Sequence, residues 1–345
     1  MPARASRPIG TYVTMAFGIL LLGLLVALLA VNLVKTPSLF FTTFFIGLTN
    51  GAVYALVALG YTLVYGILEL INFAHGDVFM LGGMISATFI TSVFHLEPGA
   101  STGSLIVAIV VTLLAAMAIC GLLNATVEAI AYRPLRNAPR LAPLITAIGM
   151  SFILQDVALA WKGPGYVTIP NVLPTGKVFQ IGGVEYTWNK LIVVIITVPV
   201  LIGLMYLVQH TRQGKAMRAT AQDKDAAAMM GINVNRTISF TFLIAGGLAG
   251  AAGLTYILYF TQVRFDQGFQ LGLIAFTAAV LGGIGNLPGA VLGSLCIGFI
   301  QAFNEGLTWH MPGSDWTQSI VFSILILVLV FRPEGLLGER TPEGG

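Results

Sequence analysis

The chain has 345 residues, of which 57% are hydrophobic and only 9% charged, whereas a soluble domain carries about 25% charged residues. Its 17 basic and 14 acidic residues give a formal net charge of +3 and are too few to cover a water-facing surface. This composition excludes a soluble enzyme, a disordered chain and a nucleic-acid-binding protein, and it predicts a polytopic membrane protein in a lipid bilayer.

The apolar stretches are long and continuous, so they predict an all-α membrane protein. A β-barrel would instead show alternating strands. Residues 1–38 are expected to form an N-terminal cytoplasmic tail and a first helix, which spans the apolar residues 12–34. A signal peptide is the alternative, but its apolar stretch would be shorter and followed by a cleavage site of small residues. Residues 39–340 are expected to form the main transmembrane domain, and residues 341–345 a C-terminal cytoplasmic tail.

Nine further apolar segments follow the first helix, and a helix needs about 20 residues to cross a bilayer. Two of them, 271–286 and 318–331, are short, so we expect eight to ten transmembrane helices. The nine segments are residues 39–66, 77–95, 104–131, 141–161, 190–209, 237–260, 271–286, 288–305 and 318–331.

The positions of the basic residues orient these segments. If the N-terminus is cytoplasmic and all ten segments cross, twelve of the 17 Lys and Arg residues lie on the cytoplasmic side and five lie outside. Cytoplasmic loops carry an excess of Lys and Arg, so cytoplasmic N- and C-termini are favoured. The second to fourth helices are oriented only by counting from the two ends, because no basic residue lies between Lys35 and Arg133.

Two polar loops interrupt the apolar segments. The external loop, residues 162–190, contains short β-like runs at 178–181 and 184–188 separated by Gly-Gly, which predicts a β-hairpin over the external mouth. The cytoplasmic loop, residues 210–236, contains Thr220 three residues before Asp223. That spacing predicts a helix beginning near Thr220, and Gly231 is expected just past its end.

The predicted cytoplasmic helix has roughly ten residues and is too short to be stable alone in water. Ala226, Met229 and Met230 would share one face, and exposed methionines suit the irregular groove of a protein partner. The alternative is a solvated connector whose alanines reflect helix propensity alone.

Several polar residues lie within or beside the apolar segments. Such groups are costly in a membrane and often mark a transport path; others simply lie at the interface, and Glu128 is expected to pair with Arg133. Asp156 is the deepest acidic candidate and is expected to face the bundle interior or an aqueous path. The candidates for a translocation path are Asn50, Asn72, His75, Asp77, Asp156 and Asn286.

Two glycine-containing stretches predict broken helices. Residues 71–77 (INFAHGD) combine Asn, His and Asp around a Gly, but a metal site would need more ligands. Residues 281–289 (LGGIGNLPG) have the same character, and the pair suggests an internal inverted repeat lining a path near the midplane. Glycines four residues apart, at 246 and 250 and at 289 and 293, predict tight helix packing.

Motifs for catalysis are missing from the sequence: there is no phosphate-binding loop, no metalloprotease motif and no nucleophile elbow. Cys120 and Cys296 lie in apolar segments and are interpreted as small buried side chains. We therefore expect no catalytic residue, cofactor or metal site in this chain, and any ATP would be hydrolysed by another chain.

Five stretches carry a family resemblance, and they cover roughly residues 39–340. Together they resemble the permease subunits of bacterial branched-chain amino acid ABC transporters, of the LivH type. The stretches are NGAVYALVALGYTLVYGILELINFAHGDVFMLGGM (50–84), AYRPLR (131–136), GKAMRATAQDKDAAAMMGINVNR (214–236), LGGIGNLPGAVLGS (281–294) and FRPEGLLGE (331–339).

The resemblance implies one subunit of an importer in the bacterial inner membrane. Its partners would be a second permease (LivM type or a second copy), two cytoplasmic ATPase subunits that bind ATP and Mg, and an extracytoplasmic binding protein that delivers leucine, isoleucine or valine. The cytoplasmic loop would be the family's coupling loop. The residues expected to contact the ATPase are Arg218, Gln222, Asp223, Asp225, Ala226, Met229, Met230 and Gly231.

Other functions remain open at this point. Related permeases carry urea, short amides or other amino acids, and a lone secondary transporter would use Asp77 or Asp156 for ion coupling. A passive channel for a small neutral solute is a third possibility. An amino acid substrate needs a partner for its carboxylate, and a broken-helix N-terminus near residues 72–77 is the favoured one.

Overall fold

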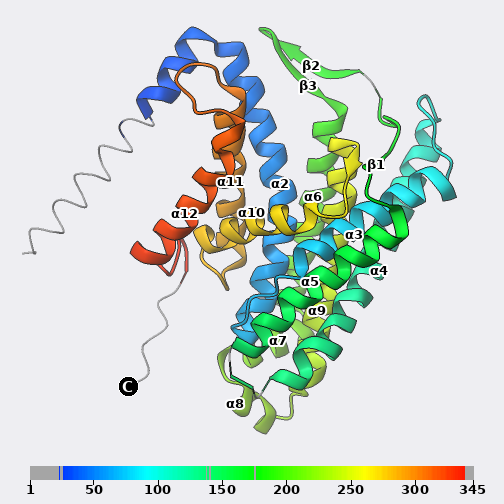
Figure 1. The fold of residues 1–345 in the computed structure, drawn as a ribbon, viewed down its shortest axis with the longest axis vertical. Coiled ribbons are helices and arrows are strands. Elements are labelled where there is room, and N and C mark those ends of the chain that lie inside the picture. The colour runs from blue at the N-terminus through cyan, green and yellow to red at the C-terminus, as the bar shows by residue number, and fades with distance from the viewer. Residues whose placement is uncertain (1–22, 24–25, 137, 140, 175, 339–345) are drawn as a thin grey trace, which may run out of the picture.

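The computed structural model describes residues 23, 26–136, 138–139, 141–174 and 176–338. Within these ranges, eight helices are long and apolar enough to cross a membrane, which confirms the predicted all-α polytopic fold. Figure 1 shows the long helices packed side by side, with a β-hairpin at one end of the molecule and two short helices, α7 and α8, at the other.

The helices follow the predicted apolar segments to within a few residues. α3 and α4 continue into π-helical turns (η1 and η2), and α4 then ends in a 3₁₀ turn (η3). The elements are α2 (Pro37–Leu68), α3 (His75–Thr88), η1 (Phe89–Val93), α4 (Thr102–Val127), η2 (Glu128–Tyr132), η3 (Arg133–Leu135), α5 (Leu141–Lys162), α6 (Trp188–His210), α7 (Arg212–Gln222), α8 (Lys224–Met229), α9 (Val234–Phe260), α10 (Gln267–Gly282), α11 (Leu287–Gly306), η4 (Ser314–Trp316) and α12 (Thr317–Phe331).

The predicted first helix is described only in part. Its described portion is the apolar helix Val26–Lys35, and most of its remainder lies outside the described residues, as do the N-terminal residues before it and residues 341–345. α10, which corresponds to the predicted segment 271–286, has 16 residues. That is fewer than the roughly 20 residues that a helix needs to cross a bilayer.

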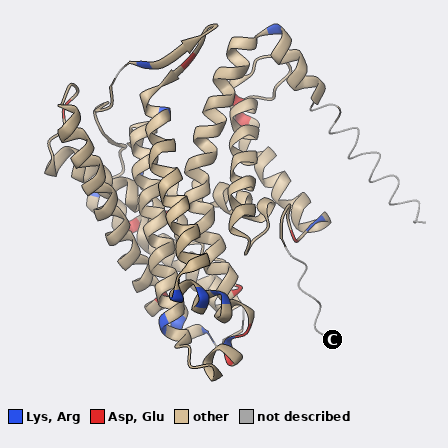
Figure 2. Cartoon of the chain, turned by 180° about the vertical axis from the view of Figure 1, so that it is seen from behind, with Lys and Arg blue, Asp and Glu red and all other residues tan. Residues whose placement is uncertain are grey.

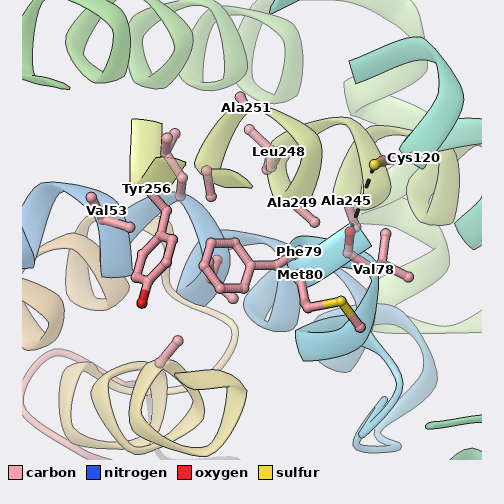
Figure 3. Packing of buried hydrophobic residues seen from close by; sticks show 14 of the residues in the cluster. Val53, Val78, Phe79, Met80, Cys120, Ala245, Leu248, Ala249, Ala251 and Tyr256 are labelled. Carbon is pink, nitrogen blue, oxygen red and sulfur yellow. Dashed lines mark hydrogen bonds between the residues drawn. The ribbon is translucent and has the colours of Figure 1, made fainter. Parts of the chain in front are cut away.

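Small residues bring the central helices into close contact. A Cβ on Gly253 of α9 would collide with the backbone of Gly83 in α3, and Gly250 faces the carbonyl of Ala116 in α4. Figure 3 shows the packing in this region, where the Phe79 and Tyr256 rings meet edge to face at 5.4 Å. The predicted tight packing through glycines is confirmed, and it places the core along α2, α3, α4 and α9.

The predicted hairpin within residues 162–190 is confirmed. β2 (Lys177–Ile181) pairs antiparallel with β3 (Val184–Thr187). Gly182 and Gly183 both have positive φ in the turn, a conformation that glycine adopts without strain. A second, shorter pair, β1 (Val167–Thr168) with β4 (Gln262–Val263), was not predicted. Phe45 packs against Tyr186, so the hairpin covers the end of the molecule where α2 begins.

Candidate translocation and coupling site

Both predicted helix breaks are present. The first lies between Leu68 and His75, where Glu69 takes a left-handed conformation and ends α2. The second lies between α10 and α11, where Gly283 and Gly285 have positive φ. The breaks lie close together, because a Cβ on Gly66 would be 3.7 Å from the Gly285 Cα.

Asn286 organises the second break. Its side-chain oxygen accepts a hydrogen bond from the Gly289 amide at 2.9 Å and caps α11, as expected of an N-cap asparagine. Its amide donates to the Leu337 carbonyl at 2.9 Å. The Leu337 amide in turn donates to the Gly282 carbonyl, so residues near the C-terminal end bind the end of α10. The geometry gives Asn286 a clear structural role; a role in the path remains a prediction.

A buried polar cluster occupies the first turn of α3. The Asp77 carboxylate accepts hydrogen bonds from the Ser151 hydroxyl and, at 3.1 Å, from the Gln155 amide. Ser151 and Gln155 lie one turn apart on α5, so both reach the same carboxylate. The path prediction included Asp77 but neither partner, although a Ser and a Gln four residues apart in an apolar helix form a polar stripe that the sequence displays.

His75 lies in the same turn of α3, beside Tyr61, with the two rings 4.9 Å apart. It fits there because Gly60 has no side chain: a Cβ at that position would collide with the His75 ring. Among the described residues, the His75 ring nitrogens make no hydrogen bond of normal geometry, although the Val57 backbone lies within reach. His75 is therefore a buried imidazole with spare hydrogen-bonding capacity.

α10 covers the N-terminus of α3. A Cβ on Gly268 would lie 2.7 Å from an Asp77 carboxylate oxygen, and one on Gly272 would lie 2.8 Å from the Gly76 Cα. The same Cβ on Gly272 would lie 2.9 Å from the Tyr61 hydroxyl. The first turn of α3 is thus covered by α10 in this conformation, and both His75 and Asp77 are fully buried.

The remaining path candidates lie in different places. Asn72 joins a second buried network, in which it accepts from the Tyr132 hydroxyl at 3.0 Å and donates to Asn124 at 3.3 Å. Asn50 is buried in α2, and its side-chain oxygen has no partner among the described residues.

Asp156 does not join the cluster. It is exposed on the outer face of α5, whereas Gln155, one residue earlier, takes the inward position. The expectation that Asp156 faces the bundle interior is wrong for this chain by itself; a place on an aqueous path stays a prediction.

Residues 210–236 contain two helices instead of one. Thr211 caps α7 by accepting from the Gly214 amide at 3.0 Å, and Asp223 caps α8 by accepting from the amides of Asp225 and Ala226. The predicted helix start near Thr220 is wrong: Thr220 is buried inside α7, where its hydroxyl donates back to the Ala216 carbonyl. The Asp223 cap, three residues later, determines where the second helix begins.

The end of α8 agrees with the prediction. Gly231 has φ of 83°, and the Ile232 amide closes the helix on the Ala227 carbonyl at 3.0 Å. Met229 and Met230 are 82% and 83% exposed, whereas Ala227 is buried. The other expected contact residues are exposed as well, except for Ala226, which is half-buried; the exposed ones are Arg218, Gln222, Asp223, Asp225 and Gly231.

α7 connects this surface to the transmembrane helices. The Arg218 guanidinium donates to the Val208 carbonyl in the last turn of α6. Met217, Arg218 and Ala221 line a cavity of about 450 Å³, which we call the vestibule. Its other walls are the end of α2, the end of α6 and the turn between α10 and α11. α7 therefore lies between the exposed methionines and the second helix break.

Comparison with known proteins identifies the family. Residues 43–330 match the family described as the branched-chain amino acid transport system permease component. The chain belongs to this permease family. It is 39% identical over 300 residues to the high-affinity branched-chain amino acid transport system permease protein BraD of Pseudomonas aeruginosa, covering 86% of this chain and 95% of that protein.

Two further relatives are permease proteins of Escherichia coli K12. It is 37% identical over 309 residues to the high-affinity branched-chain amino acid transport system permease protein LivH of Escherichia coli K12, covering 88% of this chain and 97% of the relative. It is 26% identical over 313 residues to the ribose import permease protein RbsC of the same strain, covering 89% and 90%. The comparison with solved structures found no match.

A buried carboxylate holds the α4 end of the permease to α9. Glu128 is fully buried and pairs with Arg133 at 3.2 Å, as predicted, and also with Arg136. The Ser239 hydroxyl donates to the same carboxylate at 2.8 Å. Burial lowers the pKa of the Arg136 guanidinium from its ordinary value, and the Glu128 charge opposes that shift. The second arginine and the serine were not predicted.

Proposed function

We propose that this permease is a translocation subunit of an ATP-driven importer of leucine, isoleucine and valine in the bacterial inner membrane. The observation that carries the proposal is the identity of 39% and 37% to BraD and LivH over almost their whole length. Identity to the ribose permease is 26%, which favours the amino acid substrate over a sugar.

The proposed orientation places α7 and α8 in the cytoplasm and the β2–β3 hairpin outside. Basic residues gather at the α7–α8 end of the molecule (Figure 2). Cytoplasmic segments carry such an excess of Lys and Arg. If the predicted first helix crosses the membrane as well, this orientation gives the cytoplasmic N- and C-termini that the charge pattern of the sequence predicts.

The proposed partners are a second permease, of the LivM type or a second copy, two ATPase subunits that hold ATP and Mg, and an extracytoplasmic binding protein. The exposed Met229 and Met230 support the ATPase contact, because two neighbouring apolar side chains at the tip of a polar loop are costly to leave in water. Methionine also adapts well to the groove of a partner.

The proposed coupling route begins at α8 and passes through α7 to the vestibule. Movement of α8 with the ATPases would shift α7 against the end of α2 and the α10–α11 turn. That shift would draw α10 away from the first turn of α3 and change the population of closed and open states.

Movement of α10 away from the first turn of α3 would uncover groups suited to binding an amino acid. The N-terminus of α3 offers a partial positive charge to the substrate carboxylate, and Asp77 offers a carboxylate to its ammonium group. Specificity for an apolar side chain would then come from the apolar residues around the cluster and from the binding protein.

The experiment that tests the coupling route replaces the exposed methionines. We expect Met229→Ser with Met230→Ser to lower leucine uptake by about tenfold or more, because buried apolar anchors dominate protein interfaces. The ATPase should no longer co-purify, while the variant permease should still insert and fold. The matched control is Ile181→Ser, which removes an apolar side chain that is 71% exposed at the hairpin end and should retain the ATPase. Normal uptake and ATPase retention by the double variant would contradict the proposal.

A further inference from the structure

Two surface cavities meet along the seam between α4 and α9. The first, of about 510 Å³, lies at the α7–α8 end and is lined by polar residues that include Arg133, Asn235 and Arg236. The second, of about 380 Å³, lies deeper along the seam, with α6 as a third wall. Leu243 lines both cavities, so they adjoin each other along α9, and we call the two together the α4–α9 groove.

The polar end of the α4–α9 groove is positively charged. Arg133 and Arg236 line it, and Arg136 lies beside it on Glu128. Three guanidinium groups against one carboxylate leave a net charge of +2. The Arg236 side chain is exposed and has no hydrogen bond or ion pair with any residue that the structure describes, so it is available to an anion.

The deeper end of the groove is apolar. Its walls include Met117, Leu204, Leu207 and Leu248. Two glycines, Gly203 on α6 and Gly247 on α9, leave the space open: a Cβ on Gly203 would have no atom within 4 Å. The groove thus changes from cationic to apolar along its length.

The length of the groove matches one leaflet of a bilayer. It runs along α9 from Asn233 to Leu248, which is about 22 Å at the helical rise of 1.5 Å per residue. Half of a bilayer with its headgroups is about 20–22 Å. An amphiphile with an anionic head and an apolar tail therefore fits both the chemistry and the length.

We propose that the α4–α9 groove is a specific binding site for a phospholipid with an anionic headgroup. The phosphate and headgroup lie against Arg236 and Arg133, and one acyl chain lies along Leu243 to Leu248. The lipid comes from the leaflet that surrounds the α7–α8 end. A bound lipid here would fill the space between α4, α6 and α9 and brace the Glu128 network behind it.

Native mass spectrometry of the full-length permease with added lipid tests the site. The probes are phosphatidylglycerol and phosphatidylcholine with the same acyl chains, and soluble glycerol phosphate as a competitor. We expect phosphatidylglycerol to bind about fivefold more tightly than phosphatidylcholine, as expected for one basic side chain at a membrane surface. Glycerol phosphate, which lacks the tail, should not displace it. Equal binding of the two lipids, or displacement by glycerol phosphate, would overturn the proposal.

Two pairs of variants test the cationic end and the apolar end of the groove separately. Arg236→Gln should remove most of the preference for phosphatidylglycerol, while Arg212→Gln, the same change on α7 outside the groove, should leave it intact. Gly203→Phe should fill the apolar end and weaken binding of both lipids. Gly149→Phe, at a glycine on α5 with equally open surroundings, should not.

The proposal fails if Arg236→Gln or Gly203→Phe binds phosphatidylglycerol as the unchanged permease does. It also fails if the preference disappears when the partner subunits are present, because a protein would then occupy the groove. The lipid measurement does not depend on transport, so its failure is distinct from failure of the proposed importer function.

Discussion

The central helices, such as α2 and α9, differ from the peripheral helices, such as α5 and α12, in burial far more than in apolar character. In the most apolar window of α2 and of α9, 83% and 89% of the residues are buried, against 22% in α5 and 11% in α12. All four are apolar enough to span a membrane. Because lipid tails are as apolar as leucine, hydropathy identifies the spans but does not tell which of them form the core.

Side-chain size distinguishes the two groups. The central helices meet through glycine and alanine, and they contain the buried polar clusters around Asp77 and Asn72. The peripheral helices present large side chains outward, such as Ile145 at 68% and Phe331 at 69% exposure. Substitutions matched between the groups should therefore have unequal effects.

The largest difference is expected between two glycine substitutions. Gly253→Leu places a side chain against the backbone of α3, and overpacking of this kind costs about 1–3 kcal/mol or more even where the neighbours can relax. We expect almost no folded permease by size-exclusion chromatography in detergent. Gly149→Leu on α5 meets no atom within 4 Å at its Cβ and should give a normal yield. Equal yields would contradict the division into central and peripheral helices.

The next largest difference in stability is expected between substitutions of Asp77 and of Asp156. Asp77→Ala leaves the buried Ser151 and the half-buried Gln155 without their acceptor, at a cost of about 1–3 kcal/mol for a buried unsatisfied group. Asp156→Ala removes an exposed side chain and should change stability by less than about 0.5 kcal/mol. Thermal unfolding in detergent measures both.

Asp77→Asn separates stability from transport. An asparagine retains an oxygen that accepts from Ser151 but loses the negative charge proposed for the substrate ammonium group. We expect near-normal thermal stability with strongly reduced leucine uptake. Normal uptake would remove Asp77 from the proposed path.

Removing one arginine from the buried ion pair at the end of α4 should also lower the stability of the permease. Arg136→Met leaves the fully buried Glu128 with Arg133 and Ser239, so the loss should be smaller than the roughly 3–5 kcal/mol that leaving a buried charge without a partner costs. Adding Glu128→Gln should restore part of the lost melting temperature. If the double variant is no more stable than Arg136→Met, the arginine contributes through packing and not through charge.

The smallest effect is expected at the hairpin. Lys177 pairs with Glu185, and both side chains are 45% exposed, so Lys177→Ala should change stability by less than about 1 kcal/mol. The same melting measurement applies. A loss comparable to that of Arg136→Met would show that the hairpin contributes to the folded core.

The sequence predicted the spans and the hairpin well because their signals are local. Continuous apolar residues define a helix in lipid, and Gly182–Gly183 between two short β-like runs defines a turn. The two helix breaks were also visible, because glycine and polar residues interrupt apolar segments there.

The remaining features depend on long-range contacts. Thr220 and Asp223 are both acceptable helix caps by local sequence, and burial of Thr220 against the rest of the chain makes Asp223 the cap. Whether Gln155 or Asp156 faces inward depends on the rotation of α5, which a helix apolar on most sides does not specify. The pairing of Glu128 with Ser239 required the α4–α9 contact to be known, and its pairing with Arg136 depends on how the chain turns after Tyr132.

ATP-driven leucine uptake by proteoliposomes tests the proposed function most directly. The vesicles would contain this permease with its second permease and ATPase subunits, and the binding protein would be supplied on the opposite side from ATP. We expect leucine uptake only with ATP, competition by isoleucine and valine, and no competition by ribose or urea. Leucine uptake that continues without ATP, or transport of ribose or urea in place of leucine, would contradict the proposed function.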